Sequence, residues 1–220
     1  MTVDPLFTND ERERIRQAVA EAETRTAGEI VPYVVRQSGD YDVATWRAAS
    51  ASAVLSGTLA LAVAWLNDGW DWGWLYSAWA LALVMAGGGV VGALLTLIDP
   101  IRRAFAGAEL LDTTVHRRSA VAFLEEEVFD TRDRTGILLF VSLFEHRIEV
   151  VGDAGINAKV EPHEWEEVVG LIRDGVRGAS LAEGLVAAIG KCGDLLHRRG
   201  VALRPDDTDE LPDDVRVRDE

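Results

Sequence analysis

Residues 48–66 have the sequence AASASAVLSGTLALAVAWL, and residues 74–98 have the sequence WLYSAWALALVMAGGGVVGALLTLI. Neither stretch contains a charged residue, and no Lys or Arg occurs between Arg47 and Arg102. As helices the stretches would be about 28 and 37 Å long, against a bilayer hydrocarbon core of roughly 30 Å. We therefore expect two transmembrane helices, the second of them tilted.

A short segment, residues 67–73, joins the two stretches and begins with the turn formers Asn67, Asp68 and Gly69. A connection this short makes the two spans antiparallel neighbours, so the pattern predicts a transmembrane hairpin. Tryptophans gather around the connection, as indole rings do in the headgroup region of a bilayer. They are Trp65, Trp70, Trp72, Trp74 and Trp79.

Basic residues mark the outer ends of the hairpin. Arg47 precedes the first span, Arg102 and Arg103 follow the second, and the connecting segment has none. The positive-inside rule then predicts an integral membrane protein, of the bacterial inner-membrane type, with both termini cytoplasmic and residues 67–73 outside. The alternative is a buried helical pair in a soluble bundle, which is less expected because such helices are seldom apolar on every side.

The second span contains the small-residue motif Gly88-x-x-x-Gly92. Glycines at this spacing let two helices approach closely. Two uses are open from the sequence. The glycines could pack the second span against the first, or they could form the interface of a homodimer.

The segment before the hairpin predicts one helix and one strand. Thr8 and Glu11 have the spacing of a capping box that opens a helix. Glu29–Arg36 is rich in Val, Ile and Tyr, as strands are, and Pro32 within it indicates an edge strand or a bulge.

The segment after the hairpin predicts a longer series of elements. A helix over residues 112–129 would place Val121, Leu124 and Val128 on one side. Ile137–Leu143 is a continuous apolar run, typical of a central strand, and Arg147–Val151 can pair with it across a turn at Glu145-His146. Two further helices open at Pro162 and at Ser180.

We interpret residues 4–40 and 108–200 as one discontinuous cytoplasmic α/β domain with a small mixed sheet, interrupted by the hairpin. The first segment has too few elements to form a core alone, and antiparallel spans return the chain close to its starting point. Residues 201–220 are acidic and poor in apolar residues, so we expect a disordered tail.

The net charge of −15 argues against nucleic-acid binding, which needs clustered Lys and Arg. Cys192 is the single cysteine, so an intrachain disulfide is excluded. It falls on the apolar face of the last predicted helix and is expected to be a buried small side chain rather than a reactive thiol.

Four stretches of the soluble part share a pattern with a known family: Gly28–Val31, Thr135–Ser142, Arg147–Ile156 and Gly184-Leu185. Together they resemble the TPM domain family, whose members include a thylakoid protein of photosystem II repair and an acetylcholine-receptor auxiliary subunit. The resemblance covers most of the soluble part and none of the hairpin. It implies an α/β/α sandwich around a small mixed sheet, frequent membrane attachment, and an acid-phosphatase activity with divalent-cation binding.

The chain departs from the family pattern in two ways. Many relatives are exported and anchored at one end, whereas Met1–Pro5 has neither a basic nor an apolar signal region and the expected anchor is internal. The Gly-x-Gly usual after the third strand is replaced by Gly152-Asp153-Ala154-Gly155. Export-side roles therefore do not transfer to this chain.

Four carboxylates follow or precede the predicted strands: Asp130, Asp133, Glu145 and Asp153. Carboxylates that converge from loops can hold Ca²⁺ or Mg²⁺, and a bound cation can polarise a phosphoryl oxygen. The alternative is that these acidic side chains only stabilise the turns in which they lie, by hydrogen bonds to the local backbone and by contact with solvent. His146 could act as an acid, a base or a phosphoryl acceptor if it faced that cluster, or it could be an exposed turn residue.

These features lead to two hypotheses of function. The first is a membrane-anchored interaction or assembly module that binds another membrane protein. The alternative is a weak phosphatase assisted by Ca²⁺ or Mg²⁺, with Asp133, His146 and Asp153 as candidate catalytic residues. A P-loop, a GxSxG elbow and an HExxH motif do not occur in the sequence, which lowers the expectation of the common enzyme classes.

Overall fold

The computed structural model describes residues 6–66, 74, 77–178, 180–203, 205–206 and 210–219. The predicted external loop, residues 67–73, lies outside the described residues. The chain forms two compact units, one made of Met1–Gly39 with Thr114–Glu220 and the other of Asp40–Thr113. The boundary falls within helix α5 (Ala108–Glu125).

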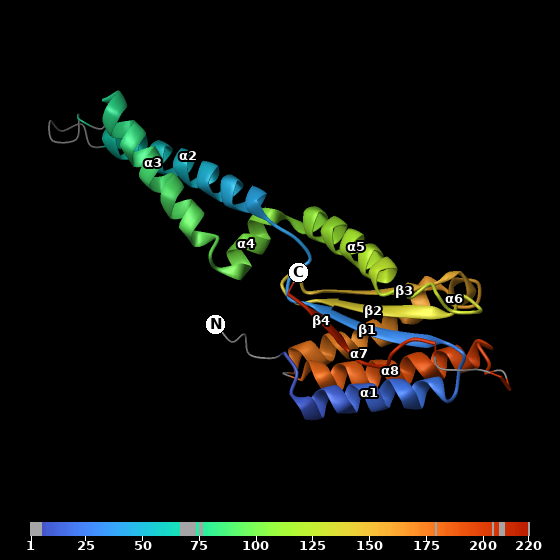
Figure 1. Cartoon of the computed structure of the whole chain (residues 1–220). Coiled ribbons are helices and arrows are strands. Elements are labelled where there is room, and N and C mark those ends of the chain that lie inside the picture. The colour runs from blue at the N-terminus through green and yellow to red at the C-terminus, as the bar shows by residue number, and fades with distance from the viewer. Residues whose placement is uncertain are drawn as a thin grey trace. The chain divides into compact units, whose positions relative to one another are not determined.

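The first unit is a mixed α/β structure built on a four-stranded sheet (Figure 1). Its strands are β1 (Glu29–Val35), β2 (Gly136–Ser142), β3 (Arg147–Gly152) and β4 (Arg216–Arg218), in the order β3-β2-β1-β4. β1 pairs in parallel with both β2 and β4, and β2 pairs antiparallel with β3. The small mixed sheet and the β2–β3 hairpin predicted from the sequence are thus confirmed.

β1 is an internal strand, so the prediction of an edge position from Pro32 is wrong. The neighbouring strand β4 begins its pairing only at Tyr33. Before that point a side chain supplies a hydrogen-bond partner on this side of β1, because the Ile30 N–H donates to the Glu23 carboxylate at 2.8 Å. Pro32 would direct its missing N–H to the same side, where no ladder bond is lost.

One face of the sheet packs on α1 (Asn9–Glu23), α7 (Glu166–Arg177) and α8 (Leu181–Arg198) (Figure 1). The predicted capping box of Thr8 and Glu11 is present at the start of α1. Two short helices, α6 (Ala154–Asn157) and η2 (Pro162–Trp165), connect β3 to α7. Cys192 of α8 is fully buried in this core, and burial raises the pKa of its thiol, as expected for an unreactive cysteine.

The other face of the sheet packs on Val115 and Ala122 of α5 and on Val128 in the turn that follows this helix. The predicted inward face of this helix is wrong for two residues, because Val121 and Leu124 are 40% and 62% exposed. The sequence has apolar residues on both sides of this helix, and periodicity alone did not show which side the sheet covers.

The C-terminal segment is ordered where the structure describes it, so the prediction of a wholly disordered tail is wrong. Val217 of β4 pairs with Val34, and Val215 and Leu211 are buried. The carboxylate of Glu126 receives hydrogen bonds from Arg216 and Arg218 at 3.2 and 3.1 Å. The few apolar residues of this acidic segment are therefore used against the sheet, although composition favoured disorder.

The second unit contains α2 (Asp42–Leu66), α3 (Ala78–Leu95) and α4 (Asp99–Ala106), followed by the beginning of α5. α2 and α3 are both long and apolar enough to cross a membrane. Only 11% of the apolar window of each helix is buried, and Leu55, Leu59 and Leu83 are each more than 60% exposed. These helices therefore present apolar surface on most sides.

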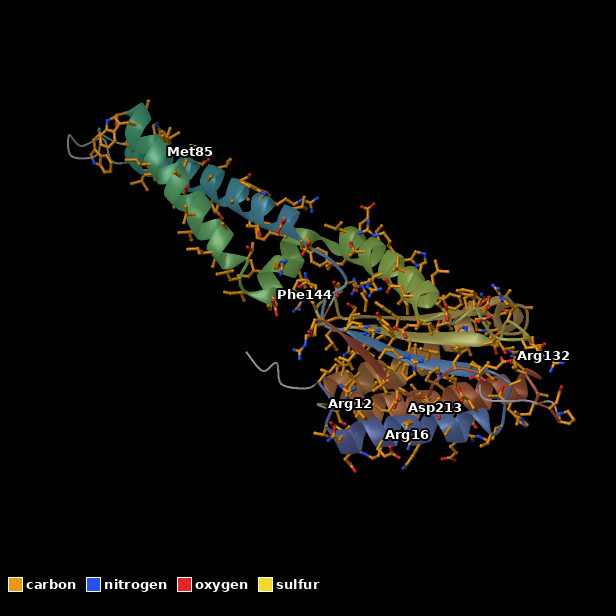
Figure 2. All side chains as sticks on the ribbon, in the orientation of Figure 1. Arg12, Arg16, Met85, Arg132, Phe144 and Asp213 are labelled. Carbon is orange, nitrogen blue, oxygen red and sulfur yellow. The ribbon has the colours of Figure 1, made fainter. Side chains whose placement is uncertain are left out.

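Small residues pack α3 against α2. A Cβ atom at Gly88 would lie 2.1 Å from the Ser56 hydroxyl oxygen, and one at Gly92 would lie 2.5 Å from the Ala48 carbonyl oxygen. Farther along, Gly57 of α2 faces Met85 of α3, which is labelled in Figure 2. Gly88 and Gly92 thus serve packing within the hairpin, and a homodimer through these glycines stays a prediction.

A basic residue closes the end of α4. Arg47 donates through Nη1 to the carbonyl oxygens of Phe105 and Ala106 at 3.1 and 2.8 Å. Carbonyls at a helix C-terminus lack intrahelical donors, and a guanidinium is well suited to satisfy them. Arg102 of the same helix lies over the ring of the buried Tyr41, 5.9 Å from its centroid.

We predict that Gly92→Val separates α2 from α3, because its side chain would enter space occupied by Ala48 and Ser52. Overpacking of this kind costs about 1–3 kcal/mol. Energy transfer between labels placed at Leu59 and Leu83 in detergent micelles should be lost at a lower fraction of SDS. Gly87→Val is the matched control, since a Cβ atom at Gly87 would have no other atom within 4 Å, and equal behaviour of the two variants would contradict this packing.

Candidate docking groove

The structure divides the predicted carboxylate cluster between the two ends of β2. The Asp153 N–H donates to the Gly136 carbonyl oxygen at 2.9 Å, at the start of that strand. Glu145 accepts a hydrogen bond from the Ser142 hydroxyl at its end. A strand of seven residues spans roughly 20 Å, so Glu145 and the adjacent His146 do not share a site with Asp153.

Asp153 has a structural role at its end of the sheet. It is 5% exposed, caps α6 by accepting the Ala154 N–H at 2.6 Å, and pairs with Arg134 at 2.7 Å. The backbone of Asp133 closes over the same helix, because a Cβ at Gly155 would lie 2.3 Å from its carbonyl oxygen. These contacts are sufficient to explain the Asp at position 153 and the Gly at position 155, and no bound ligand is needed to account for them.

Asp130 is exposed in the loop before β2. Within the described residues, no group of three or more His, Cys, Asp or Glu side chains is placed to hold a metal ion. The predicted site of Asp130, Asp133, Glu145 and Asp153 acting together is therefore wrong, since one member lies at the far end of the strand.

Glu145 is buried, with 1% exposure, and ties two loops together. It accepts the Ser38 N–H at 2.8 Å and the Ser142 hydroxyl, while the Ser38 and Ser142 hydroxyl oxygens lie 2.7 Å apart. The segment after β1 is thereby held against the β2–β3 turn. The turn itself requires a left-handed backbone at His146, whose φ is 55°, and its side chain is exposed.

One serine, histidine and glutamate group that the sequence analysis missed lies between α5 and β3. The Ser119 hydroxyl donates to the Glu149 carboxylate at 2.5 Å, and His116 Nδ1 lies 3.5 Å from the same oxygen. The Ser119 and His116 side chains therefore both contact the Glu149 carboxylate. A nucleophilic triad needs the serine to donate to the histidine instead, so this group has the residue types of a hydrolase without its geometry.

A hollow of the α/β unit runs between the outer edge of β3 and α7, and we call it the β3–α7 groove. It comprises a cavity of about 730 Å³ whose lining includes Ile148, Arg173, Val176 and Arg177. A second cavity of about 520 Å³ is lined by Val150, Trp165, Glu166, Val169 and again Arg173, so one carboxylate also borders the groove. Since Arg173 lines both cavities, they adjoin along one side of α7.

The spacing of residues on α7 explains how the helix forms this wall. Val169, Arg173, Val176 and Arg177 stand at intervals of four, three and one, which places them on one face of a helix. Val168 and Ile172 point into the core instead. No function was expected from the sequence for the two arginines. Their spacing was the signal that could have revealed the groove.

The outer edge of β3 offers unpaired backbone groups. The Asp153 N–H donates to Gly136 of β2, and backbone groups of successive residues in a strand point to alternate sides. The N–H and C=O groups of Ile148 and Val150 therefore point away from β2. Gly152 lies two residues beyond Val150, so its carbonyl also points outward, and it accepts a hydrogen bond from the Asn157 side-chain amide at 2.6 Å. No strand in the described part of the chain lies beyond β3.

Positive charge collects at this groove although the whole chain has a net charge of −15. Arg173 and Arg177 are exposed and lie one helical turn apart. Neither makes an ion pair with any residue in the described ranges. His146 and Arg147 line the same cavity at the end of β2. The groove therefore joins an apolar floor, an open strand edge and two arginines available to an anionic ligand.

Comparison with known proteins adds a likeness of fold. No protein-family model matches the sequence, and no curated protein sequence matches it. The NMR structure of the BA42 protein from the psychrophilic bacterium Bizionia argentinensis is similar, with a TM-score of 0.59 and 18% identity over 99% of each chain. At this identity the likeness supports the fold and says nothing about activity.

We predict that Asp153→Ala destabilises the protein by about 1–2 kcal/mol, because α6 loses its cap and Arg134 loses its partner. The decrease in Tm, followed by circular dichroism, should be the same in EDTA and in millimolar Ca²⁺ or Mg²⁺. Asp130→Ala, which removes an exposed carboxylate from the same region, should leave Tm unchanged. A cation that stabilises the unaltered protein but not Asp153→Ala would instead show that Asp153 is a ligand.

Proposed function

We propose that this protein is a membrane-anchored interaction module whose α/β unit docks a segment of another membrane protein in the β3–α7 groove. The observation that carries the proposal is the combination of an open strand edge, apolar side chains and two arginines along one hollow. Grooves with an apolar floor and a few placed charges are typical of peptide-binding sites.

The proposed anchor is the hairpin of α2 and α3. Its support is the exposure of large apolar side chains such as Leu59 and Leu83 around both helices. In water this surface would be costly, and in a bilayer it would be solvated by lipid. We propose an integral protein of the bacterial inner-membrane type with cytoplasmic termini, because Arg47, Arg102 and Arg103 stand at the outer ends of the spans.

We further propose that the α/β unit is an α/β/α sandwich of the TPM type. Helices pack on both faces of its mixed sheet, three on one face and α5 on the other, which supports this classification. The stretches that suggested the family include Arg147–Ile156, which here form β3 and the start of α6.

The alternative activity, a phosphatase assisted by Ca²⁺ or Mg²⁺, stays a prediction. The carboxylates proposed for it are separated along β2, and Asp153 is engaged by Arg134 and by α6. We therefore give docking precedence over catalysis.

The sidedness of the anchor can be measured with a single engineered cysteine. Gly69→Cys should react with an impermeant maleimide from the outside of intact cells, and Val43→Cys only after the membrane is opened. Cys192 is buried and has a raised thiol pKa, so it contributes no background. Labelling of Gly69→Cys only from the cytoplasmic side, or recovery of the full-length chain in the aqueous fraction, would contradict the anchor as proposed.

Docking is tested by photo-crosslinking in the native membrane. A benzophenone side chain at Val176, inside the groove, should form an adduct with a membrane protein, and one at Leu124 on α5 should not. The adduct should fall at least tenfold in Arg173→Glu/Arg177→Glu. Equal adducts at both positions, or none at Val176, would count against the groove as the docking site.

A further inference from the structure

The chemistry of the β3–α7 groove specifies its ligand more narrowly. Resting on the proposed docking function, we infer that the groove binds an extended acidic segment of a partner protein, which adds to the sheet as a fifth strand beside β3. Three independent features of the groove lead to this ligand: the backbone of the edge, the charge of α7, and the apolar floor between them.

The backbone at the edge can receive a strand. The N–H and C=O groups of Ile148 and Val150 point outward, which provides two donors and two acceptors at the spacing of a strand ladder. The opposite edge of the described sheet is β4, a strand of three residues that offers only a short ladder. β3 has six residues and is the longer open edge, and added strands are held mainly by such backbone bonds.

The charge on α7 selects for carboxylates. Arg173 and Arg177 follow one another along the groove and lack acidic partners among the described residues. A neutral or basic segment would leave both guanidinium groups uncompensated, whereas Asp or Glu side chains at alternate positions could pair with them. The remainder of this chain is strongly acidic, so a second copy would be repelled overall rather than attracted.

The apolar floor lies on the same face of the sheet as the two arginines and limits which side chains can face α7. Ile148 and Val150 contribute to the core from the α7 face of β3, and Val176 is 39% exposed at the opposite wall. Side chains of an added strand alternate between faces, so Glu residues at every second position would face α7, with their methylene groups over this apolar surface and their carboxylates at the two arginines. The Val or Ile residues between them would lie on the other face of the sheet and favour the extended conformation. The expected ligand is therefore an alternating acidic and β-branched sequence in extended conformation.

The experiment uses the full-length protein in zwitterionic detergent micelles. A fluorescent eight-residue peptide of alternating Glu and Val should bind, as measured by anisotropy, and the same peptide with Lys in place of Glu should not. Arg173→Glu/Arg177→Glu should weaken binding at least tenfold. Arg12→Glu/Arg117→Glu, which makes the same change of net charge on α1 and α5, should leave binding within twofold.

Strand addition has its own readout in amide hydrogen exchange. Peptide binding should slow exchange of the outward amides of Ile148 and Val150 at least tenfold, while the Glu149 amide, already directed to β2, changes little. Val150→Pro should retain the fold, because that N–H makes no ladder bond, and should lose peptide binding; Val150→Thr should retain both. The exchange data decide the question should the proline variant fail to fold.

Several results would overturn the inference. Equal binding of the acidic and basic peptides would remove the charge selection, and binding without protection of Ile148 and Val150 would remove strand addition. Stronger perturbation of these amides by short-chain phosphatidylglycerol than by the peptide would assign the groove to a lipid headgroup. Groove-dependent crosslinks with no acidic-peptide binding would reject this ligand and leave the docking function standing, whereas absence of the crosslinks would reject the docking function itself.

Discussion

The whole structure depends on the parallel pairing of β1 with β2. Seven residues of each strand are in register, from Glu29 beside Gly136 to Val35 beside Ser142, and both strands are fully buried. Parallel neighbours cannot be joined by a tight turn, so the chain must leave the sheet and return. Residues 36–135 make this crossover, and they contain the entire second unit. The apolar hairpin is thus an insertion that the sheet tolerates because its ends are fixed by strand pairing.

The same pairing determines which sheet edges are available. With β1 and β2 in the centre, β4 covers part of one side and β3 forms the other. β4 is a short edge of three residues secured by its own ion pairs to Glu126, whereas β3 presents the outward groups of Ile148 and Val150 along an edge of six residues. An open edge is normally an aggregation hazard. Here α7 follows that edge with two arginines, which would favour acidic segments over other exposed strands.

Much of the fold was accessible from the sequence where one pattern had only one consistent solution. The continuous apolar run of β2 predicted a central strand, and the short connection to β3 predicted a hairpin. Predictions failed where the local pattern allowed more than one position or more than one buried face for an element. Pro32 suggested an edge, but β4 pairs only beyond it, and Val121 and Leu124 suggested an inward face of α5 that is exposed. The candidate carboxylates were grouped by their position in loops, and strand direction then separated Glu145 from Asp153.

By itself the sequence determined the two uncharged helices, the central strand, the β2–β3 hairpin and the caps at Thr8 and Ser180, because each depends on residues close together in the chain. Only the tertiary structure decided the order of the strands, the covered face of α5 and the place of β4. It also decided the groove, which joins Ile148 and Val150 of one element to Arg173 and Arg177 of another. Such sites depend on long-range packing, and local patterns carry no record of which distant surfaces meet.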